Sequence, residues 1–377
     1  MSAARRWCLV ALGVLALVLT PLAVEAWPAS QSEVSAPRLL QQIRDSQDLA
    51  YSGYVESTGG IAFPTTEQFG GVADLLGDRN RLRVWWRGPD TWRVDKVATG
   101  GETGLYSDGE LSYAWDYESL EATPTLHQLS PLPRTVDLVP PQLAHRVLAD
   151  ARTEEVSRLP VERIAGRDAA GLRLTPSEPQ SSIDHVDVWA DTETGLPVRV
   201  EVWGEGEQST AVATGFIELS LEPPDEETTT FAAAPGVDVM TGGISGESLV
   251  SHIPEAFVAP RLAGLANSYD GSTLRAGPSL VTRYGHGVTQ LLVIGLDDEI
   301  ADPLREQLAA TAGRVIDDRL GTSLAAGAMH LLLTPCQGDE PSWLLVGTVD
   351  EATLLKAAEV AVRQRSSVPL ASYPADQ

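Results

Sequence analysis

Short segments in which apolar and polar residues alternate recur at roughly ten-residue spacing through the first two-thirds of the chain. Turn-forming sequences such as Arg87-Gly88-Pro89-Asp90 and Ser107-Asp108-Gly109 separate these segments. Strands joined by such tight turns pair antiparallel, because a parallel pair needs a long crossover connection. The pattern therefore predicts an antiparallel meander, with strands at 51–57, 81–87, 91–97, 104–108, 111–117, 161–164, 169–174, 183–190, 196–203 and 211–221.

Helical periodicity appears at two places in the same part of the chain. Residues 35–49 carry Leu39, Leu40 and Ile43 on one helical face, and residues 138–152 form a second candidate helix that Pro140-Pro141 would start. Two short helices among about ten strands predict an α+β fold in which the helices cover one face of a sheet.

The segment 183–203 has the most regular alternation. Its two halves flank the turn Asp191-Thr192-Glu193-Thr194-Gly195, so they are expected to form a hairpin with one apolar face and one polar face. The residues expected on the apolar face are Val186, Val188, Val198 and Val200. Those expected on the polar face are His185, Asp187, Arg199 and Glu201.

Aromatic residues are concentrated in these strands. Six of the nine tryptophans fall there, and alternation places Trp86 with Leu82 and Val84 on one face of their strand, and Trp115 with Tyr113 on one face of theirs. Two interpretations follow: an ordinary packed sheet core, or a concave apolar face that two helices cannot cover and that would hold an acyl chain or an apolar peptide. The residues expected to line such a cavity are Leu82, Val84, Trp86, Trp92, Tyr113, Trp115, Val186, Val188, Val198 and Val200.

The composition changes after the last strand of the meander. Residues 222–249 are rich in Pro, Glu, Thr and Gly, which is typical of a linker. We therefore expect a first domain at 35–235, a linker at 236–250 and a small α+β domain at 251–366. In the small domain the pattern predicts strands at 279–284, 288–296, 328–334 and 343–348, and helices at 303–312 and 350–363.

The N-terminus has the features of an export signal. Arg5 and Arg6 precede an apolar run over 7–19, and Val24-Glu25-Ala26 places small residues where a signal peptidase would cut. Residues 1–26 are either a cleaved signal peptide or a single uncleaved anchor, because the apolar run is close to the length that spans a bilayer. Both interpretations place the rest of the chain outside the cytoplasm.

Charge and motif content argue against several functions. The chain has 27 Lys plus Arg against 52 Asp plus Glu, and a net charge of −25 repels nucleic-acid phosphates. The six histidines show no metal-ligand spacing, and the sequence contains no His-Glu-x-x-His, Cys-x-x-Cys, Gly-x-Ser-x-Gly or P-loop motif. We therefore expect no catalytic residue, no metal ligand and no cofactor.

Two sequence phrases resemble known families. The hairpin phrase from Val186 to Val200 is similar to the late hairpin of the LolA/LppX-like superfamily of lipoprotein carriers, and Tyr51-Ser52-Gly53-Tyr54 resembles the first strand of the sigma-E regulatory protein RseB (MucB). RseB also adds a smaller C-terminal domain to a LolA-like one. The resemblance implies an unclosed antiparallel β-barrel, plugged by helices, whose apolar interior binds lipid or lipoprotein acyl chains.

Three functional hypotheses result. The first is a non-enzymatic extracytoplasmic protein that binds lipid or lipoprotein acyl chains, as a carrier or a sensor. The second is an envelope-stress regulator of the sigma-factor type that uses the same fold to grip a membrane-protein partner, with the small domain as a docking surface. The third is a hydrolase hidden among the many carboxylates, which no motif supports.

Overall fold

The computed structural model describes residues 34–60, 77, 79–98, 101–109, 111–126, 135–232, 238–239, 255–257, 259–268, 281–296, 298–311, 314–317, 319–335, 342–363 and 367–369. The expected signal or anchor at 1–26 and most of the expected linker at 236–250 lie outside these residues. Within the described part of the chain, no helix has the length and apolar character needed to cross a membrane.

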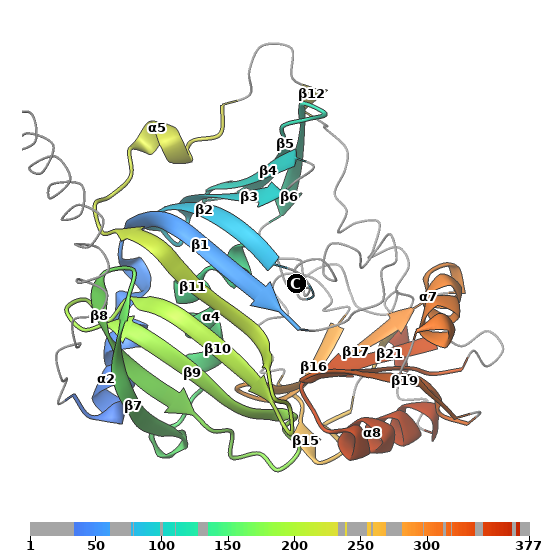
Figure 1. Ribbon diagram of the computed structural model, residues 1–377. Coiled ribbons are helices and arrows are strands. Elements are labelled where there is room, and N and C mark those ends of the chain that lie inside the picture. Colours follow the sequence, from blue (N-terminus) through green and yellow to red (C-terminus); the bar gives the residue numbers. More distant parts are fainter. Residues whose placement is uncertain are drawn as a thin grey trace, which may run out of the picture.

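A large curved sheet dominates the first part of the chain (Figure 1). Its twelve strands lie in the order β12-β6-β5-β4-β3-β2-β1-β11-β10-β9-β8-β7, and only the β12–β6 pair is parallel among these strands. The two edge strands, β12 and β7, do not pair with each other, so the sheet is an unclosed barrel, as the resemblance to the LolA/LppX-like superfamily implies. The strands are β1 (Tyr51–Gly59), β2 (Arg79–Gly88), β3 (Thr91–Ala98), β4 (Gly101–Asp108), β5 (Leu111–Asp116), β6 (Glu121–Leu126), β7 (Val156–Ile164), β8 (Arg167–Leu174), β9 (Ile183–Asp191), β10 (Pro197–Gly204), β11 (Thr210–Ser220) and β12 (Asp238–Val239).

Short helical segments cover the inner face of this sheet, which is the face that carries Val84 and Val200. They are α2 (Ala36–Asp45), η1 (Ser46–Asp48), η2 (Thr135–Leu138), α4 (Pro140–Leu148) and η3 (Thr153–Glu155). Helix α2 packs on β7 and β8, and α4 packs on β10 and β11. Leu39, Leu40 and Ile43 of α2 are buried, as their spacing predicts. Both helices begin with proline in the first turn, where the missing backbone N–H costs nothing.

Helices α2 and α4 satisfy each other's C-terminal carbonyl groups. The Arg44 guanidinium of α2 donates to the carbonyl oxygens of Leu148 and Ala151, each at 2.7 Å. In return, Nε2 of His145 on α4 lies 2.9 Å from the carbonyl oxygen of Ile43. The last carbonyls of a helix have no partner within the helix. The two helices therefore depend on each other and form one cover, which we call the helical cover.

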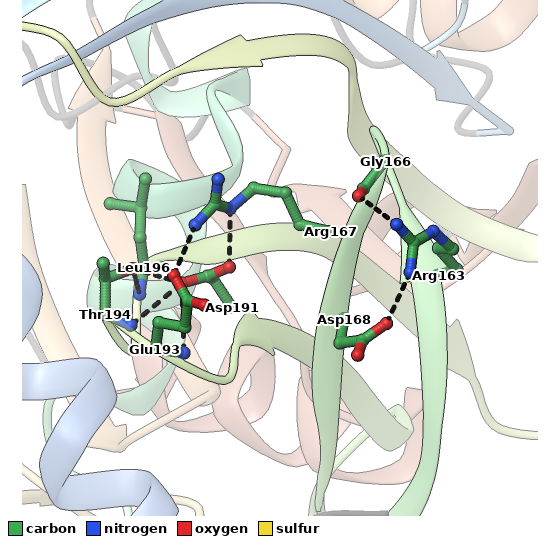
Figure 2. A network of polar contacts seen from close by, with 8 residues as sticks. All are labelled: Arg163, Gly166, Arg167, Asp168, Asp191, Glu193, Thr194 and Leu196. Atoms are coloured by element: carbon green, nitrogen blue, oxygen red, sulfur yellow. Dashed lines mark hydrogen bonds and ion pairs between the residues drawn. The ribbon is translucent and has the colours of Figure 1, made fainter. Parts of the chain in front are cut away.

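The hairpin phrase that resembles the LolA/LppX-like superfamily builds a hydrogen-bonded turn between β9 and β10 (Figure 2). Asp191 accepts hydrogen bonds from the backbone N–H of Thr194 (2.8 Å), from the Thr194 hydroxyl (2.7 Å) and from Nε of Arg167 (2.6 Å). Gly195 has a positive φ of 76°, and a Cβ there would lie 2.6 Å from the carbonyl oxygen of Gln42. The turn thus rests directly on α2, which explains why glycine is required.

The second part of the chain forms a six-stranded antiparallel sheet in the order β16-β17-β21-β20-β19-β18. Helix α8 (Glu351–Arg363) packs on one face, and α7 (Asp298–Ala310) on the other. Asp350 caps α8 by accepting from the backbone N–H of Thr353 at 2.6 Å, as the sequence predicts. The strands are β16 (Val281–His286), β17 (Thr289–Leu296), β18 (Arg314–Asp317), β19 (Gly321–Ala326), β20 (Met329–Leu333) and β21 (Ser342–Gly347), with short pairs β13 (Glu255–Phe257)–β22 (Ser367–Pro369) and β14 (Arg261–Leu262)–β15 (Leu265–Ala266).

The small sheet meets the large one at Ser182, just before β9, and at Gly204, the last residue of β10, which lies next to Ala328. Both parts are visible in Figure 1. Ser182 connects the two parts: its backbone N–H donates to Thr348 and its hydroxyl donates to the carbonyl oxygen of Ala328 at 2.6 Å. Ala326, the last residue of β19, and Ala328, in the turn after it, belong to the same apolar core as the large sheet. The two parts are therefore joined by a packed interface, and the division at 236–250 stays a prediction about the connecting chain.

Several segments differ from the expected elements, among them strands β6, β18 and β19, which lie where no strand is predicted. Helix α7 begins at Asp298 rather than Pro303, and Pro303 lies inside the helix. The segment of linker-like composition, 222–249, contains the short helix α5 (Glu226–Thr229), which packs on β2, β3 and β4. A proline near the beginning of a helix does not fix the residue at which the helix begins. A four-residue helix is too short to show helical periodicity in the sequence.

Candidate ligand-binding site

The register of β1, β2 and β3 determines which of their side chains face inward. Val84 lies opposite Val94, and Trp86 lies opposite both Tyr51 and Trp92. Residues directly opposite each other in paired strands share a face. Because side chains alternate along a strand, Leu82, Val84 and Trp86 all point to the inner face, and Trp85 points to the outer one.

Eight of the ten residues expected to line a cavity meet on this inner face. They belong to one apolar core together with residues of α2, η2 and α4, and none is more than 3% exposed. The eight are Leu82, Val84, Trp86, Trp92, Val186, Val188, Val198 and Val200. Their inward orientation agrees with the sequence pattern, while their role as ligand contacts stays a prediction.

Three aromatic rings form a stack at one end of the inner face. The ring of Trp86 lies between those of Tyr51 (centroids 5.9 Å apart, planes at 8°) and Trp92 (5.7 Å, 6°). Phe216 packs edge-on against Tyr51. Offset stacks of this kind add stabilisation beyond the area they bury. The stack gives this end of the inner face a rigid, flat wall.

A pocket of about 90 Å³ opens beside the stack, between the β2–β3 turn and the helical cover. Its volume is well below the roughly 300–1,000 Å³ of pockets that enclose a whole small molecule. The eight sheet residues of the inner face are themselves at most 3% exposed, so other side chains of the core cover them. The pocket is lined by Gln47, Trp86, Pro89, Trp92, Val136, Asp137 and Gln142.

The polar groups of the pocket are held by neighbours. Asp137 pairs with Arg146 at 3.1 Å, and the Nε2 amide of Gln142 donates to the Tyr51 hydroxyl at 3.4 Å. Burial raises the pKa of Tyr51, although the hydrogen bond from Gln142 works in the opposite direction, so the phenol stays neutral. Trp92 donates its indole N–H to the carbonyl oxygen of Pro89 at 3.1 Å. Each of these polar groups is thus held by a neighbouring residue of the protein.

Tyr113 and Trp115 differ from the expectation, because they lie on the outer face. Tyr113 is opposite Tyr106, which is opposite Arg93, which in turn is opposite Trp85. The strand 111–117 alternates as predicted, but alternation alone does not say which face is inside; the register across β3 and β4 does. Both aromatic residues therefore lie outside the core that contains Trp86.

The outer face carries a small aromatic cluster of its own. Phe231, from the chain segment after α5, stacks on Tyr113 (centroids 4.6 Å apart, planes at 14°) and contacts Tyr106 and Trp115. The burial that Trp115 achieves (9% exposed) thus comes from a segment far along the chain. Packing in this cluster, rather than a cavity, thus explains the positions of Tyr113 and of Trp115, one of the six strand tryptophans.

A buried ion pair lies beside that cluster. Arg93 donates to both oxygens of Asp95, at 2.8 and 2.6 Å, and its guanidinium lies over the rings of Trp85 and Tyr106. Burial raises the pKa of Asp95 and outweighs the opposite influence of Arg93. The opposite charges of Arg93 and Asp95 balance each other within the sheet, which is typical of an ion pair with a structural role.

Sequence reasoning missed Gln47, Pro89, Val136, Asp137 and Gln142 as pocket residues. They come from three separate segments, and polar residues at the ends of short helices carry no periodic signal. The proline of the β2–β3 turn and the Pro140-Pro141 start of α4 were visible in the sequence, but only as turn and helix signals. Among the described residues, no group of His, Cys, Asp and Glu side chains could hold a metal ion.

Comparison with known proteins gives similarity in structure but not in sequence. No family model and no curated protein matches the chain. The complex of MucA and MucB from Pseudomonas aeruginosa is similar over 89% of this chain and 98% of that chain (16% identity, TM-score 0.48), as is MucB in complex with MucA(peri) (16%, 0.47). A LolA superfamily protein from Nitrosomonas europaea covers 52% of this chain and 98% of its own (14%, 0.27). The chain is thus similar to MucB along most of its length and to a LolA superfamily protein along about half of it, the two resemblances expected from the sequence.

Proposed function

We propose that the protein binds lipid or lipoprotein acyl chains outside the cytoplasm, as a carrier or a sensor, without catalysing a reaction. The observation that carries the proposal is the inner face itself: eight apolar side chains of the large sheet lie beneath a cover of short helices, and a pocket opens at its aromatic end. The signal or anchor expected at residues 1–26 supports the location.

An acyl chain would occupy the inner face only after the helical cover moves. The pocket of about 90 Å³ is too small for it, so the chain would start at the Trp86 and Trp92 wall and displace α4 and η2. Burying about 400 Å² of acyl surface at about 25 cal/mol/Å² contributes on the order of 10 kcal/mol. Lost motional freedom and the cost of moving the cover offset much of this gain.

Adjacent tryptophans on opposite faces provide a matched test. Trp86→Phe and Trp85→Phe each remove one indole and keep an aromatic ring, but only Trp86 lies in the core and lines the pocket. The probe is a lipid whose stearoyl chain carries two bromine atoms, because bromine quenches the fluorescence of nearby tryptophans. We expect the probe to quench the wild-type protein and Trp85→Phe alike, and to quench Trp86→Phe less.

Equal quenching of the two variants, or no quenching of the wild type, would contradict the inner-face site. Trp92→Phe should behave like Trp86→Phe, because the two rings stack. Thermal melting of each variant shows whether a loss of quenching reflects a loss of fold.

A second candidate function is a regulator that binds a protein partner. The size of the pocket favours it, since about 90 Å³ suits one side chain of a peptide better than a whole acyl chain. MucB, to which this chain is similar, is known in complex with MucA(peri). Native mass spectrometry of protein purified from its own membranes separates the two functions: a lipid-sized mass adduct supports the carrier or sensor, and a co-purifying protein with no lipid adduct supports the regulator.

A further inference from the structure

His145 occupies the contact between the two helices of the helical cover. Its Nε2 lies 2.9 Å from the carbonyl oxygen of Ile43 and 3.2 Å from the hydroxyl of Ser46. The Ser46 hydroxyl donates its own hydrogen to the same carbonyl, at 2.6 Å. Both atoms facing Nε2 can therefore only accept, and Nε2 must carry the hydrogen of the neutral ring.

The other ring nitrogen has the opposite environment. Nδ1 of His145 is buried and has no hydrogen-bond partner. In the neutral ring this nitrogen is an acceptor without a donor. Its burial costs little free energy compared with the burial of an unpaired charge. A second proton would have to bind at Nδ1, where it would meet no acceptor.

The surrounding charges do not reverse this conclusion. Asp48 on η1 favours the protonated ring, whereas Arg44 on α2 is bound to the carbonyls at the end of α4. Arg146, the next residue on α4, pairs with Asp137 of η2. Strands β10 and β11, which pack on α4, contribute inner-face residues that do not titrate: Val198, Val200 and Thr214. Burial outweighs the Ile43 and Asp48 interactions and lowers the pKa of His145.

We propose that His145 is a proton-sensitive latch on the helical cover: protonation at Nδ1 weakens the α2–α4 contact and lets α4 move away from the inner face. The consequence for ligands, that an acyl chain is exchanged more readily at acidic pH, rests on the proposed function. The latch itself does not, because it concerns only the attachment of α4.

The sign of the pH dependence follows from the direction of the shift. The closed cover binds this proton less well than the open one, so its stability is fully present above the ordinary histidine pKa of about 6.5 and is lost as the pH falls below it. One such proton changes the opening equilibrium by up to about tenfold per pH unit between the two pKa values.

Hydrogen exchange of the full chain tests the latch. The amides of α4 should exchange faster as the pH is lowered from 8 to 5, after correction for the intrinsic pH dependence of exchange, by up to about tenfold per unit below 6.5. His145→Gln keeps an N–H donor for Ile43 but does not titrate, so its α4 exchange should not change with pH. His185→Gln, which removes a histidine from the outer face next to Trp203, should behave like the wild type.

Identical pH dependence in the wild type and His145→Gln overturns the latch, as does α4 exchange that stays constant from pH 8 to 5. Should His145→Gln fail to fold, the nitrogen resonances of His145 in the wild type decide: hydrogen on Nδ1 at pH 8 contradicts the proposal. A neutral fluorescent fatty-acid ester, which does not itself titrate, is added in parallel. If α4 exchange depends on pH but the ester binds at no pH, the latch is supported and the proposed function is contradicted.

Discussion

At the scale of single residues, Asp191 shows how a sequence phrase becomes structure. Its carboxylate is 2% exposed and accepts from Arg167 and from the backbone and hydroxyl of Thr194. Burial alone would raise the pKa of Asp191, but these hydrogen bonds and the charge of Arg167 together lower it. The Asp-Thr-x-Thr-Gly phrase is therefore a turn motif, and together with the alternation on either side it located the hairpin in the sequence.

Replacing this carboxylate should destabilise the fold. We expect Asp191→Ala to lower the free energy of unfolding by about 2–4 kcal/mol, because it removes the buried acceptor of Arg167 and of the turn N–H groups and leaves Arg167 only its contact with the exposed Glu193. The wild type should also lose this contribution as the pH falls below the ordinary aspartate pKa of about 4, since a lowered pKa stabilises only the ionised form. Urea unfolding at pH 7 and pH 3 measures both effects.

Asp116 provides the control, because it accepts from the backbone N–H groups of Glu118 and Ser119 in an exposed turn. Asp116→Ala should change the unfolding free energy far less. Similar losses for the two variants would show that the turn, and not the buried Arg167 pair, holds the hairpin.

The residue scale also shows where prediction from sequence ends. Alternation correctly separated Trp85 from Trp86, because neighbours on a strand always face opposite ways. It could not decide the face of Tyr113 and Trp115, whose orientation depends on how β3 and β4 bring β5 into register with β2. The pocket residues could not be predicted for a similar reason, since only the folded chain brings Gln47, Pro89 and Gln142 together.

At the scale of elements, the β9–β10 turn is held against α2. Gly195 and Gly206 flank the two ends of β10 and have nearly the same φ, 76° and 73°. A Cβ at Gly195 would lie 2.6 Å from the carbonyl oxygen of Gln42, whereas a Cβ at Gly206 would meet no atom within 4 Å. Comparison of the two glycines therefore separates two effects of a substitution: the strain of a positive φ and the clash with helix α2.

Alanine at each position measures that contact. Gly206→Ala should cost about 1–2 kcal/mol, from the left-handed backbone alone. Gly195→Ala should cost a further 1–3 kcal/mol or so, because α2 must shift to admit the methyl group. Thermal or urea unfolding gives both values, and equal losses would mean that the turn and α2 are not in firm contact.

Elements with a strong periodic signal were predicted well, and those defined by tertiary context were not. The strands of the hairpin 183–203, helix α2 and the Asp350 cap of α8 all follow from local pattern. Helix α5 and its neighbour Phe231 fall in a segment whose composition indicates a linker. Packing on the outer face orders this segment, and such packing leaves no trace in the local sequence.

At the scale of the whole molecule, the turn between β19 and β20 joins the two sheets. Ala328 is 2% exposed, and its carbonyl oxygen accepts from the Ser182 hydroxyl. Ala325, three residues earlier on the same hairpin, is exposed. On this one hairpin, Ala328 therefore lies in the interface and Ala325 lies on the exposed surface beside it.

Glutamate at the two positions tests the interface. Ala328→Glu places an unpaired charge among apolar side chains and should separate the small sheet from the large one, which small-angle scattering would detect as a larger radius of gyration. Ala325→Glu should leave the scattering curve unchanged. If Ala328→Glu scatters like the wild type, the two sheets do not depend on this contact.

The order of strands in the large sheet has a consequence for how the chain folds. Among the described strands β1 to β11, every neighbouring pair is consecutive in the sequence except β1 and β11. Two meanders, β1 to β6 and β7 to β11, can thus each form from local contacts, which fold fast. The β1–β11 seam must close a loop that contains all the other strands, and closing so long a loop is slow. Until the seam forms, the inner edges of both meanders stay open to wrong partners, so the seam is the step at which a folding chaperone would have most effect.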